Sequence, residues 1–348
     1  MQQIQTSEAK KRAVAEQLYL KAAQETPQQR SVIRHTRKPA VMIAAAAAAM
    51  LCIGTVTVGA ATGWNYGALF ERYFSHTAEV PVTYDFTGMG GDLNEVFETD
   101  DYILTLESYI ADTNSLYLYY DVKLKHDDTV GKTEIREGRV FSATHPHMQY
   151  FLHGSDEPIF TGGSSDYLGQ DADGTVHIVE RTMMPRGESL EGLSLDVCCE
   201  DMSSGLEGYP GNPEDKHTIT LDTVYPAELH PLETPVMLTV PNTGEEAEQN
   251  YAAVSPIGVY LTAGAEQQLL SAPCENGSFG ATMGESASVT VHHTDGTEET
   301  LDADKMVIMA GDSTGVLTEN VTLLSFKQPI PLDDVDYVTV NGTVIPVR

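Results

Sequence analysis

The feature that most constrains this chain is a long stretch without charged side chains near its N-terminus. No Asp, Glu, Lys or Arg occurs from Pro39 to Phe70, and the most apolar part runs from Val41 to Ala61. As a helix, this part would be about 32 Å long, enough to cross a hydrocarbon core of about 30 Å. Only helices and closed barrels satisfy their backbone groups in lipid. The sequence therefore predicts a transmembrane helix over residues 39–63.

The flanking residues give this predicted helix an orientation. Arg34, Arg37 and Lys38 precede it, and Trp64 follows it where an interfacial aromatic anchor belongs. The positive-inside rule then places the N-terminus in the cytoplasm. A cleaved signal peptide is the alternative, since residues 59–61 are small, but the preceding basic region and the apolar run are both long for one. We expect a single-pass protein of the cell membrane with extracellular C-terminal domains.

Residues 1–38 form a predicted cytoplasmic arm that contains one helix, over residues 7–23. Val14, Leu18 and Ala22 recur at helical spacing and would form a narrow apolar stripe. A lone helix of this length is marginal in water, so it needs a protein partner or the anionic inner leaflet of the membrane. The stripe suits a small protein partner, and the basic residues around it suit lipid.

The remaining chain is strongly acidic. Residues 65–348 hold 12 Lys/Arg and 48 Asp/Glu, which gives a net charge of -36. A field of that sign repels phosphate backbones, so this part of the chain is not expected to bind nucleic acid.

Period-two alternation dominates from residue 80 onward. Residues 102–125 read as a hairpin whose turn contains Asp112-Thr113-Asn114, and Asn341-Gly342 is a type I′ hairpin signal. Many short strands with such turns are typical of antiparallel sandwiches. The predicted fold is mainly β, with the N-terminal helix and the transmembrane helix followed by two immunoglobulin-like β-sandwich domains. Its segments are a juxtamembrane stretch over 64–79, domains over 80–240 and 249–348, and a linker over 241–248.

Few motifs suggest chemistry. Asp171, Asp173 and Glu180 match three positions of a calcium loop, but Gly169 stands where the first ligand belongs, and an Asp-Gly turn explains the same residues. A disulfide from Cys198 or Cys199 to Cys274 is possible, although buried thiols are the simpler interpretation. We find no catalytic, cofactor or metal constellation, and the sequence predicts a protein that is not an enzyme.

The order of these parts resembles a known group of proteins. The residues that carry the resemblance are the segment 64–74, the hairpin at 102–125, the stretch 254–261 and the closing stretch 330–342. They are similar to Gram-positive, clostridial-type single-pass membrane proteins with an ectodomain of unknown function, several of which look like anti-sigma factors. The resemblance covers about residues 40–348 and implies no catalytic residues. The arm lacks the His/Cys motif of zinc-binding anti-sigma factors.

Two functions are favoured over a third, an envelope enzyme, which would require acidic or His residues that converge in one pocket. The first is a membrane-anchored envelope sensor, anti-sigma-factor-like, that holds a sigma factor or another cytoplasmic protein through residues 1–38 and senses an unknown extracellular ligand. The second is a cell-surface binding or adhesion module with an inert anchor.

Overall fold

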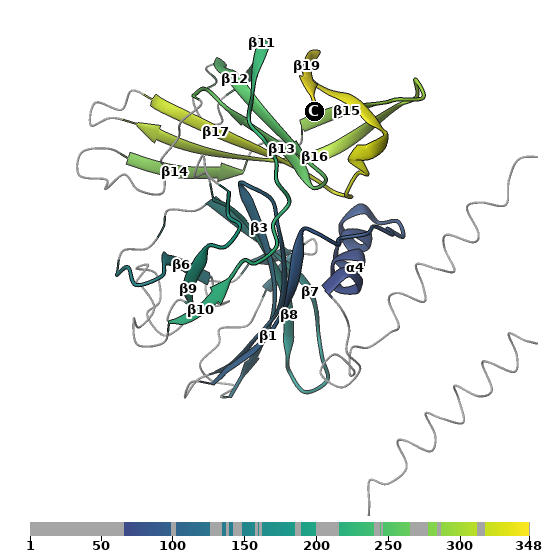
Figure 1. The fold of residues 1–348 in the computed structure, drawn as a ribbon. Helices are drawn as coiled ribbons and strands as arrows, with labels where there is room; N and C mark the ends of the chain where they lie inside the picture. Colours follow the sequence, from purple (N-terminus) through teal and green to yellow (C-terminus); the bar gives the residue numbers. More distant parts are fainter. Residues whose placement is uncertain are drawn as a thin grey trace, which may run out of the picture. The chain divides into compact units, whose positions relative to one another are not determined.

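A computed structural model of the chain describes residues 66–347 with internal gaps. The gaps are residues 99–101, 126–133, 137–138, 142–147, 157–158, 160–161, 185–188, 200–215, 240–243, 245, 265–277, 284–286 and 312–316. The described residues belong to one compact unit, within which the sheets define two parts. We call residues 66–229 the first β-region and residues 230–347 the second β-region; Figure 1 labels their strands.

The first β-region contains two antiparallel sheets and a short strand pair. The larger sheet has the order β1-β2-β3-β8-β7, the smaller one has the order β10-β9-β6, and β4 pairs with β5. The strands are β1 (Gly90–Glu98), β2 (Tyr102–Ala111), β3 (Ser115–Leu124), β4 (Glu134–Arg136), β5 (Arg139–Phe141), β6 (Met148–Leu152), β7 (Gly162–Gln170), β8 (Val176–Met183), β9 (Ser194–Cys199) and β10 (His217–Thr220). The pairing of β2 with β3 is the hairpin that the alternation predicts.

Alternation along the strands places an apolar core between these two sheets. In β3, Leu116, Leu118, Tyr120 and Val122 face this core, because successive side chains of a strand point to opposite faces. The smaller sheet contributes the buried residues Met148, Tyr150, Leu195, Val197 and Ile219. The first β-region is therefore a β-sandwich.

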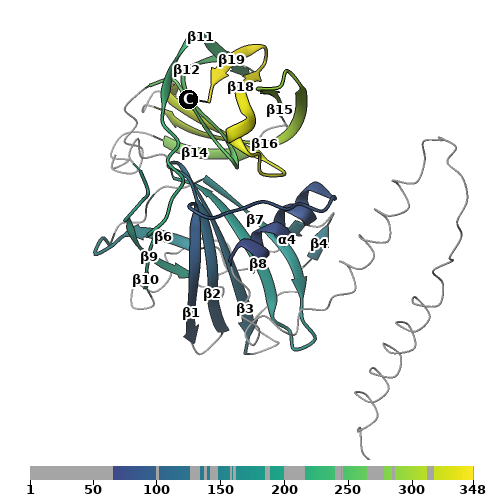
Figure 2. The same cartoon turned by 45° about the vertical axis from the view of Figure 1, so that its right-hand side comes forward.

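Helix α4 (Tyr66–Ala78) covers the opposite face of the larger sheet, and Figure 2 shows it alongside that sheet. Leu69, Phe70, Tyr73 and Phe74 form its buried face and pack against residues of β2, β3 and β8. Phe74 also stacks on the ring of Phe86 at 5.8 Å between centroids. Since offset aromatic pairs stabilise a core beyond their buried area, this cluster fixes the helix to the sheet.

The second β-region is a single antiparallel sheet. Its order is β11-β12-β13-β17-β16-β15-β18-β19, and β14 pairs with β16 outside this path. The elements are β11 (His230–Thr239), β12 (Glu246–Ser255), β13 (Gly258–Thr262), β14 (Ser278–Met283), β15 (Ala287–His293), β16 (Glu298–Gly311), β17 (Leu317–Phe326), the 3-10 helix η2 (Leu332–Asp334), β18 (Val335–Val340) and β19 (Thr343–Pro346). Strand β11 thus joins β12 and not the sheets of the first β-region.

This sheet curls until its two end strands meet. Asn341 Nδ2 donates a hydrogen bond to the Met237 carbonyl at 2.9 Å, and Thr343 Oγ1 donates one to the Pro235 carbonyl at 3.3 Å. One apolar core, with buried residues from β11, β12, β13, β15, β16, β17, β18 and β19, fills the interior. Asn341 and Gly342 both have positive φ, as the type I′ turn between β18 and β19 requires.

Several sequence predictions need correction or lie outside the described residues. The helix predicted over 7–23 and the transmembrane helix predicted over 39–63 are outside them. Among the residues that the structure describes, α4 is the only α-helix, and no helix is long and apolar enough to cross a membrane. The structure therefore does not support the single-pass membrane topology or the cell-membrane localisation derived from it.

The predicted fold class is corrected in the same way. The described chain is mainly β with antiparallel sheets, as expected, but it carries one α-helix that covers a sheet and no spanning helix. The immunoglobulin-like pair of sandwiches is also wrong for the second β-region, because one continuous sheet curls around its own core there.

Candidate functional site

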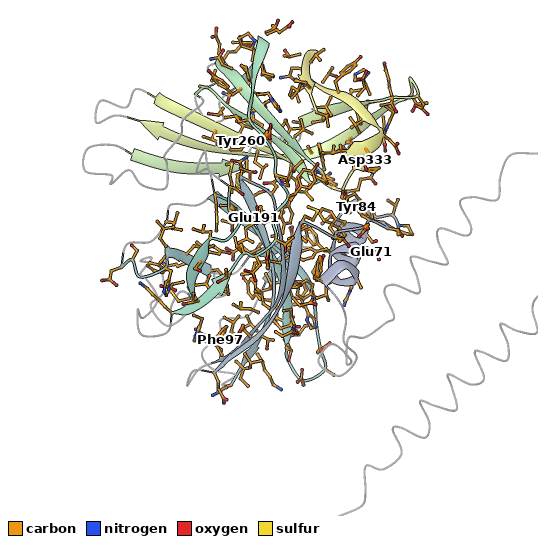
Figure 3. The ribbon with its side chains drawn as sticks, in the orientation of Figure 1. Glu71, Tyr84, Phe97, Glu191, Tyr260 and Asp333 are labelled. Atoms are coloured by element: carbon orange, nitrogen blue, oxygen red, sulfur yellow. The ribbon has the colours of Figure 1, made fainter. Side chains whose placement is uncertain are left out.

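The outer face of the second β-region packs against one end of the first. Met183 and Ala227 of the first β-region contact an apolar cluster from β12, β13, β16 and β17, whose members are Ala253, Tyr260, Met306, Val321 and Leu323. Tyr260, labelled in Figure 3, points outward from β13 into this cluster, because its neighbours Val259 and Leu261 face the inner core. The junction is thus a third, smaller apolar layer.

A buried arginine also joins the two β-regions. Arg181 of β8 is 6 % exposed, and its Nη1 lies 2.8 Å from Oδ2 of Asp304 on β16. Its Nε lies 3.2 Å from Oδ2 of Asp166 on β7, which also accepts a hydrogen bond from the Tyr73 hydroxyl at 2.9 Å. The guanidinium therefore connects the larger sheet directly to the second β-region, and connects it to helix α4 through Asp166 and Tyr73.

The turn between β2 and β3 is organised by the buried carboxylate of Asp112. Its Oδ1 accepts hydrogen bonds from the backbone N–H of Asn114 at 2.9 Å and of Ser115 at 2.7 Å. Its Oδ2 accepts one from the hydroxyl of Ser255, the last residue of β12 in the second β-region, at 2.5 Å. Burial raises the pKa of Asp112, and these hydrogen bonds oppose that rise. One carboxylate therefore shapes the turn and ties it to the second β-region.

The segment after β10 lies against this turn. The backbone N–H of Tyr225 donates to the Ala111 carbonyl at 2.9 Å, and that of Ala227 donates to Thr113 Oγ1 at 2.9 Å. Residues more than a hundred positions apart in the chain are thereby held side by side. Pro226 lies between these two anchors and has no N–H of its own to satisfy.

A pocket of about 420 Å³ lies at this junction. It is lined by Thr113 and Asn114 of the β2–β3 turn, by Ser189, by Pro226–Leu229, and by Tyr260, Thr262 and Gly264 of the second β-region. Its volume falls toward the low end of the range of about 300–1,000 Å³ that is typical of small-molecule sites. Both β-regions contribute to its wall, which is common for ligand sites.

Asn114 is the most informative residue of this wall. It is only 3 % exposed, and its backbone groups are bonded, the N–H to Asp112 and the carbonyl to the N–H of Met184 at 2.7 Å. Its side-chain carboxamide makes no hydrogen bond to any residue that the structure describes. The amide atoms are not among the polar atoms sealed from water, so the carboxamide is open to the pocket, where a ligand or water can bind to it.

Glu228 is the only charged residue among the described residues that line the pocket. It is exposed, and it forms no ion pair or hydrogen bond with the described part of the chain. The hydroxyls of Thr113 and Thr262 lie in the same wall, the latter donating to the Gly264 carbonyl at 3.1 Å. The pocket is therefore polar on one side, with a negative charge at its exposed part, and apolar at Pro226, Ala227 and Leu229.

A second buried carboxyl, Glu180, lies within the sandwich and not at the junction. It accepts hydrogen bonds from the hydroxyls of Tyr150 at 3.1 Å and Tyr120 at 3.3 Å, and from the N–H of Met148 at 3.2 Å. Burial raises the pKa of Glu180 to about 7, although each of these hydrogen bonds lowers it. The carboxyl therefore joins β8 to β6 and β3 inside the core.

The structure does not bring the calcium-loop residues together. Asp173 is exposed and pairs with Lys123 at 2.7 Å, and Asp171 lies 3.4 Å from Nε2 of the buried His177. Glu180 points into the core on the opposite face of β8 from His177. Within the described residues, no cluster of His, Cys, Asp or Glu could hold a metal ion.

The other predicted site residues lie outside the described part of the chain. These are Val14, Leu18 and Ala22 of the arm, and Arg34, Arg37, Lys38 and Trp64 around the predicted transmembrane helix. Of the three cysteines considered for a disulfide, Cys198 is buried as a thiol. The sequence did mark Asp112-Thr113-Asn114 as a turn, but nothing in it showed that residues 226–229 and 260–264 would complete a pocket there.

Comparisons with known proteins add little. No family model matches the chain, and no curated protein matches it. One solved structure, described as the conserved domain protein from Bacillus anthracis, is similar over 73% of this chain and 77% of its own, with 13% sequence identity and a TM-score of 0.40.

Proposed function

We propose that this protein is a sensory binding module that takes up a small ligand in the junction pocket. The observation that carries this proposal is the position of Asn114, whose side-chain carboxamide lines the pocket and has no hydrogen-bond partner among the described residues. Its polar atoms are not sealed from water, so the carboxamide is open to the pocket. A ligand can therefore use both the donor and the acceptor of this amide.

The surroundings of the pocket support a sensory role in particular. The turn that supplies Thr113 and Asn114 is the same turn whose Asp112 bonds Ser255 across the junction. A ligand that shifts this turn therefore changes a contact between the two β-regions. Binding at a site coupled to such a contact can shift the equilibrium between two arrangements by its difference in affinity for them.

This proposal is independent of the predicted arm. The sigma-factor or other protein partner predicted for residues 1–38 involves residues outside the described part, and the pocket uses none of them. The sequence-based hypothesis combined a cytoplasmic protein partner with the sensing of a ligand, and the pocket supports the second of these.

The test is a screen of small polar molecules against the whole protein, followed by protein-observed NMR. A substitution in the lining provides the comparison: no described atom lies within 4 Å of a Cβ built at Gly264, so Gly264→Trp adds a large side chain at the wall of the pocket without a clash at Cβ. We expect compounds that shift signals of Asn114 and Tyr260 to lose binding in this variant.

Thr294→Trp is the matched control, because it adds the same side chain at an exposed position outside the pocket. It should bind these compounds as the unmodified protein does. Binding that persists in Gly264→Trp, or a screen in which no compound perturbs the lining residues, would contradict the proposal.

A further inference from the structure

We propose that the junction pocket selects ligands that carry a primary ammonium group on a short alkyl chain. This inference rests on the proposed function, since it names the chemical class of ligand for the same pocket. It follows from the charge of the lining, from the oxygen atoms of its polar groups, and from the position of its apolar wall.

The charge of the lining disfavours the binding of anions and favours the binding of cations. Glu228 supplies a carboxylate, and the described lining residues include no Lys, Arg or His. No cation of the described chain neutralises this carboxylate. The net charge of -36 on residues 65–348 adds a long-range field of the same sign, which raises the local concentration of cations and lowers that of anions.

The polar groups of the lining suit an ammonium group, although the hydroxyls of Thr113 and Thr262 already form hydrogen bonds within the chain. An ammonium has three N–H donors and no acceptor, so it needs several oxygen atoms around it. Asn114 offers its side-chain carbonyl oxygen, Glu228 offers two carboxylate oxygens, and Thr113 and Thr262 offer hydroxyl oxygens. Asn114 as a residue is only 3 % exposed, so a charge-assisted hydrogen bond to its carboxamide would lie at the inner side of the pocket.

The apolar wall suits an alkyl chain. Residues 226–229 form one continuous segment of the lining, and three of them, Pro226, Ala227 and Leu229, are apolar. Each methylene group that such a wall removes from water contributes about 0.8 kcal/mol. A pocket of about 420 Å³ holds a chain of a few carbons and not a polymer segment.

The test uses three probes that share a four-carbon skeleton and differ in its terminal groups: 1,4-diaminobutane, 1,4-butanediol and succinate. Each is titrated into the full chain by calorimetry at one ionic strength, and the site is checked from NMR shifts at Asn114. We expect 1,4-diaminobutane to bind at least about 10-fold more tightly than the other two, because a difference of about 1.4 kcal/mol is tenfold in affinity.

Two charge-removing variants separate the pocket from the general field. Glu228→Gln should weaken binding of the diamine by about tenfold, a loss of about 1.4 kcal/mol. Glu248→Gln removes the same charge from an exposed position of β12 outside the pocket and should change affinity less than twofold. Equal losses in both variants would show diffuse attraction to an acidic surface and would overturn the inference.

The remaining outcomes distinguish this inference from the proposed function. If butanediol or succinate shifts the signals of Asn114 with equal or higher affinity, the pocket binds ligands but the ammonium preference is wrong. If the diamine leaves those signals unchanged while other compounds of the screen shift them, the inference again fails and the proposed function stands. If no compound of any class shifts them, both fail.

Discussion

The two β-regions bury different kinds of polar side chain. In the first, Asp112, His177, Glu180, Arg181 and Asp196 are all 7 % exposed or less. In the second, the buried polar residues that the structure describes are uncharged, namely Gln249, Ser255, Thr262, Thr322 and Ser325. Among the described residues, the first β-region thus adds buried ionisable groups with specific partners to its apolar cores, whereas the second adds only uncharged polar groups.

This difference has an energetic meaning. A buried ionised group is stable only where a partner and hydrogen bonds replace its lost hydration. Arg181 has Asp166 and Asp304, and Asp112 has backbone and hydroxyl donors. The first β-region therefore depends on pH and on single polar contacts, whereas the curled sheet depends on the volume of its apolar side chains.

The largest expected effect comes from removing the arginine that joins the regions. Arg181→Met leaves the carboxylates of Asp166 and Asp304 without their cation, although both are only about one-fifth exposed. Breaking one partner of a buried pair costs about 3–5 kcal/mol, so we expect the free energy of unfolding in urea to fall by about 4 kcal/mol.

Lys123→Met is the matched control for this change. Lys123 pairs with Asp173 at 2.7 Å, but both side chains are about half exposed. Exposed pairs contribute about 0–1 kcal/mol. A loss in Arg181→Met as small as that in Lys123→Met would show that the ion pairs do not hold the junction.

The second effect is a pH dependence that belongs to Glu180. Its folded-state pKa is raised from 4.5 to about 7, so the stability that it contributes is fully present below the unfolded pKa and is lost as the pH rises through 7. This shift corresponds to about 3 kcal/mol. Glu180→Gln keeps the shape of the side chain and removes its titration. The difference in the free energy of unfolding between this variant and the unmodified protein should therefore change by about 3 kcal/mol between pH 4.5 and pH 8, in favour of the variant at high pH.

The second β-region provides the contrast. Leu261→Ala removes a fully buried side chain from the curled sheet and should cost about 3 kcal/mol at both pH values, because its cost is a transfer and cavity term without a titrating group. If Leu261→Ala instead shows the stronger dependence on pH, the comparison between the regions is wrong.

The smallest of these effects tests the hydrogen bond between Ser255 and Asp112 beside the pocket. Ser255→Ala removes the hydroxyl that donates to Asp112 across the junction, and the buried carboxylate is left short of one donor. We expect a loss of about 2 kcal/mol in the free energy of unfolding. Ser288→Ala, at an exposed serine of β15, should change stability by less than about 0.5 kcal/mol. Equal effects of the two substitutions would count against the link.

Local patterns were readable from the sequence, whereas distant contacts were not. The hairpin of β2 and β3 follows from its alternation, and the final turn follows from Asn341-Gly342. The spacing of Leu69, Phe70, Tyr73 and Phe74 also indicates a helix with one apolar face, although the segment was interpreted only as a juxtamembrane stretch.

The site was not predictable because it depends on packing between distant segments. Asn114 has the same local sequence whether its turn is exposed or covered, and the residues of 226–229 and β13 that share its pocket are more than a hundred positions away in the chain. The curl of the second sheet has a similar origin, since the meeting of β11 with β19 joins residues about a hundred positions apart. Hydrophobic alternation records which face is buried and not which strand is the neighbour.

The contact between β11 and β19 gives the curled sheet a seam. Elsewhere around the ring, neighbouring strands share ladders of backbone hydrogen bonds, but here the described hydrogen bonds are donated by two side chains, those of Asn341 and Thr343. A ring joined in this way parts first at its seam, since side chains can rotate away without any strand losing its own ladder. The curled sheet can therefore widen or tighten by small movements along one line while its core strands stay paired.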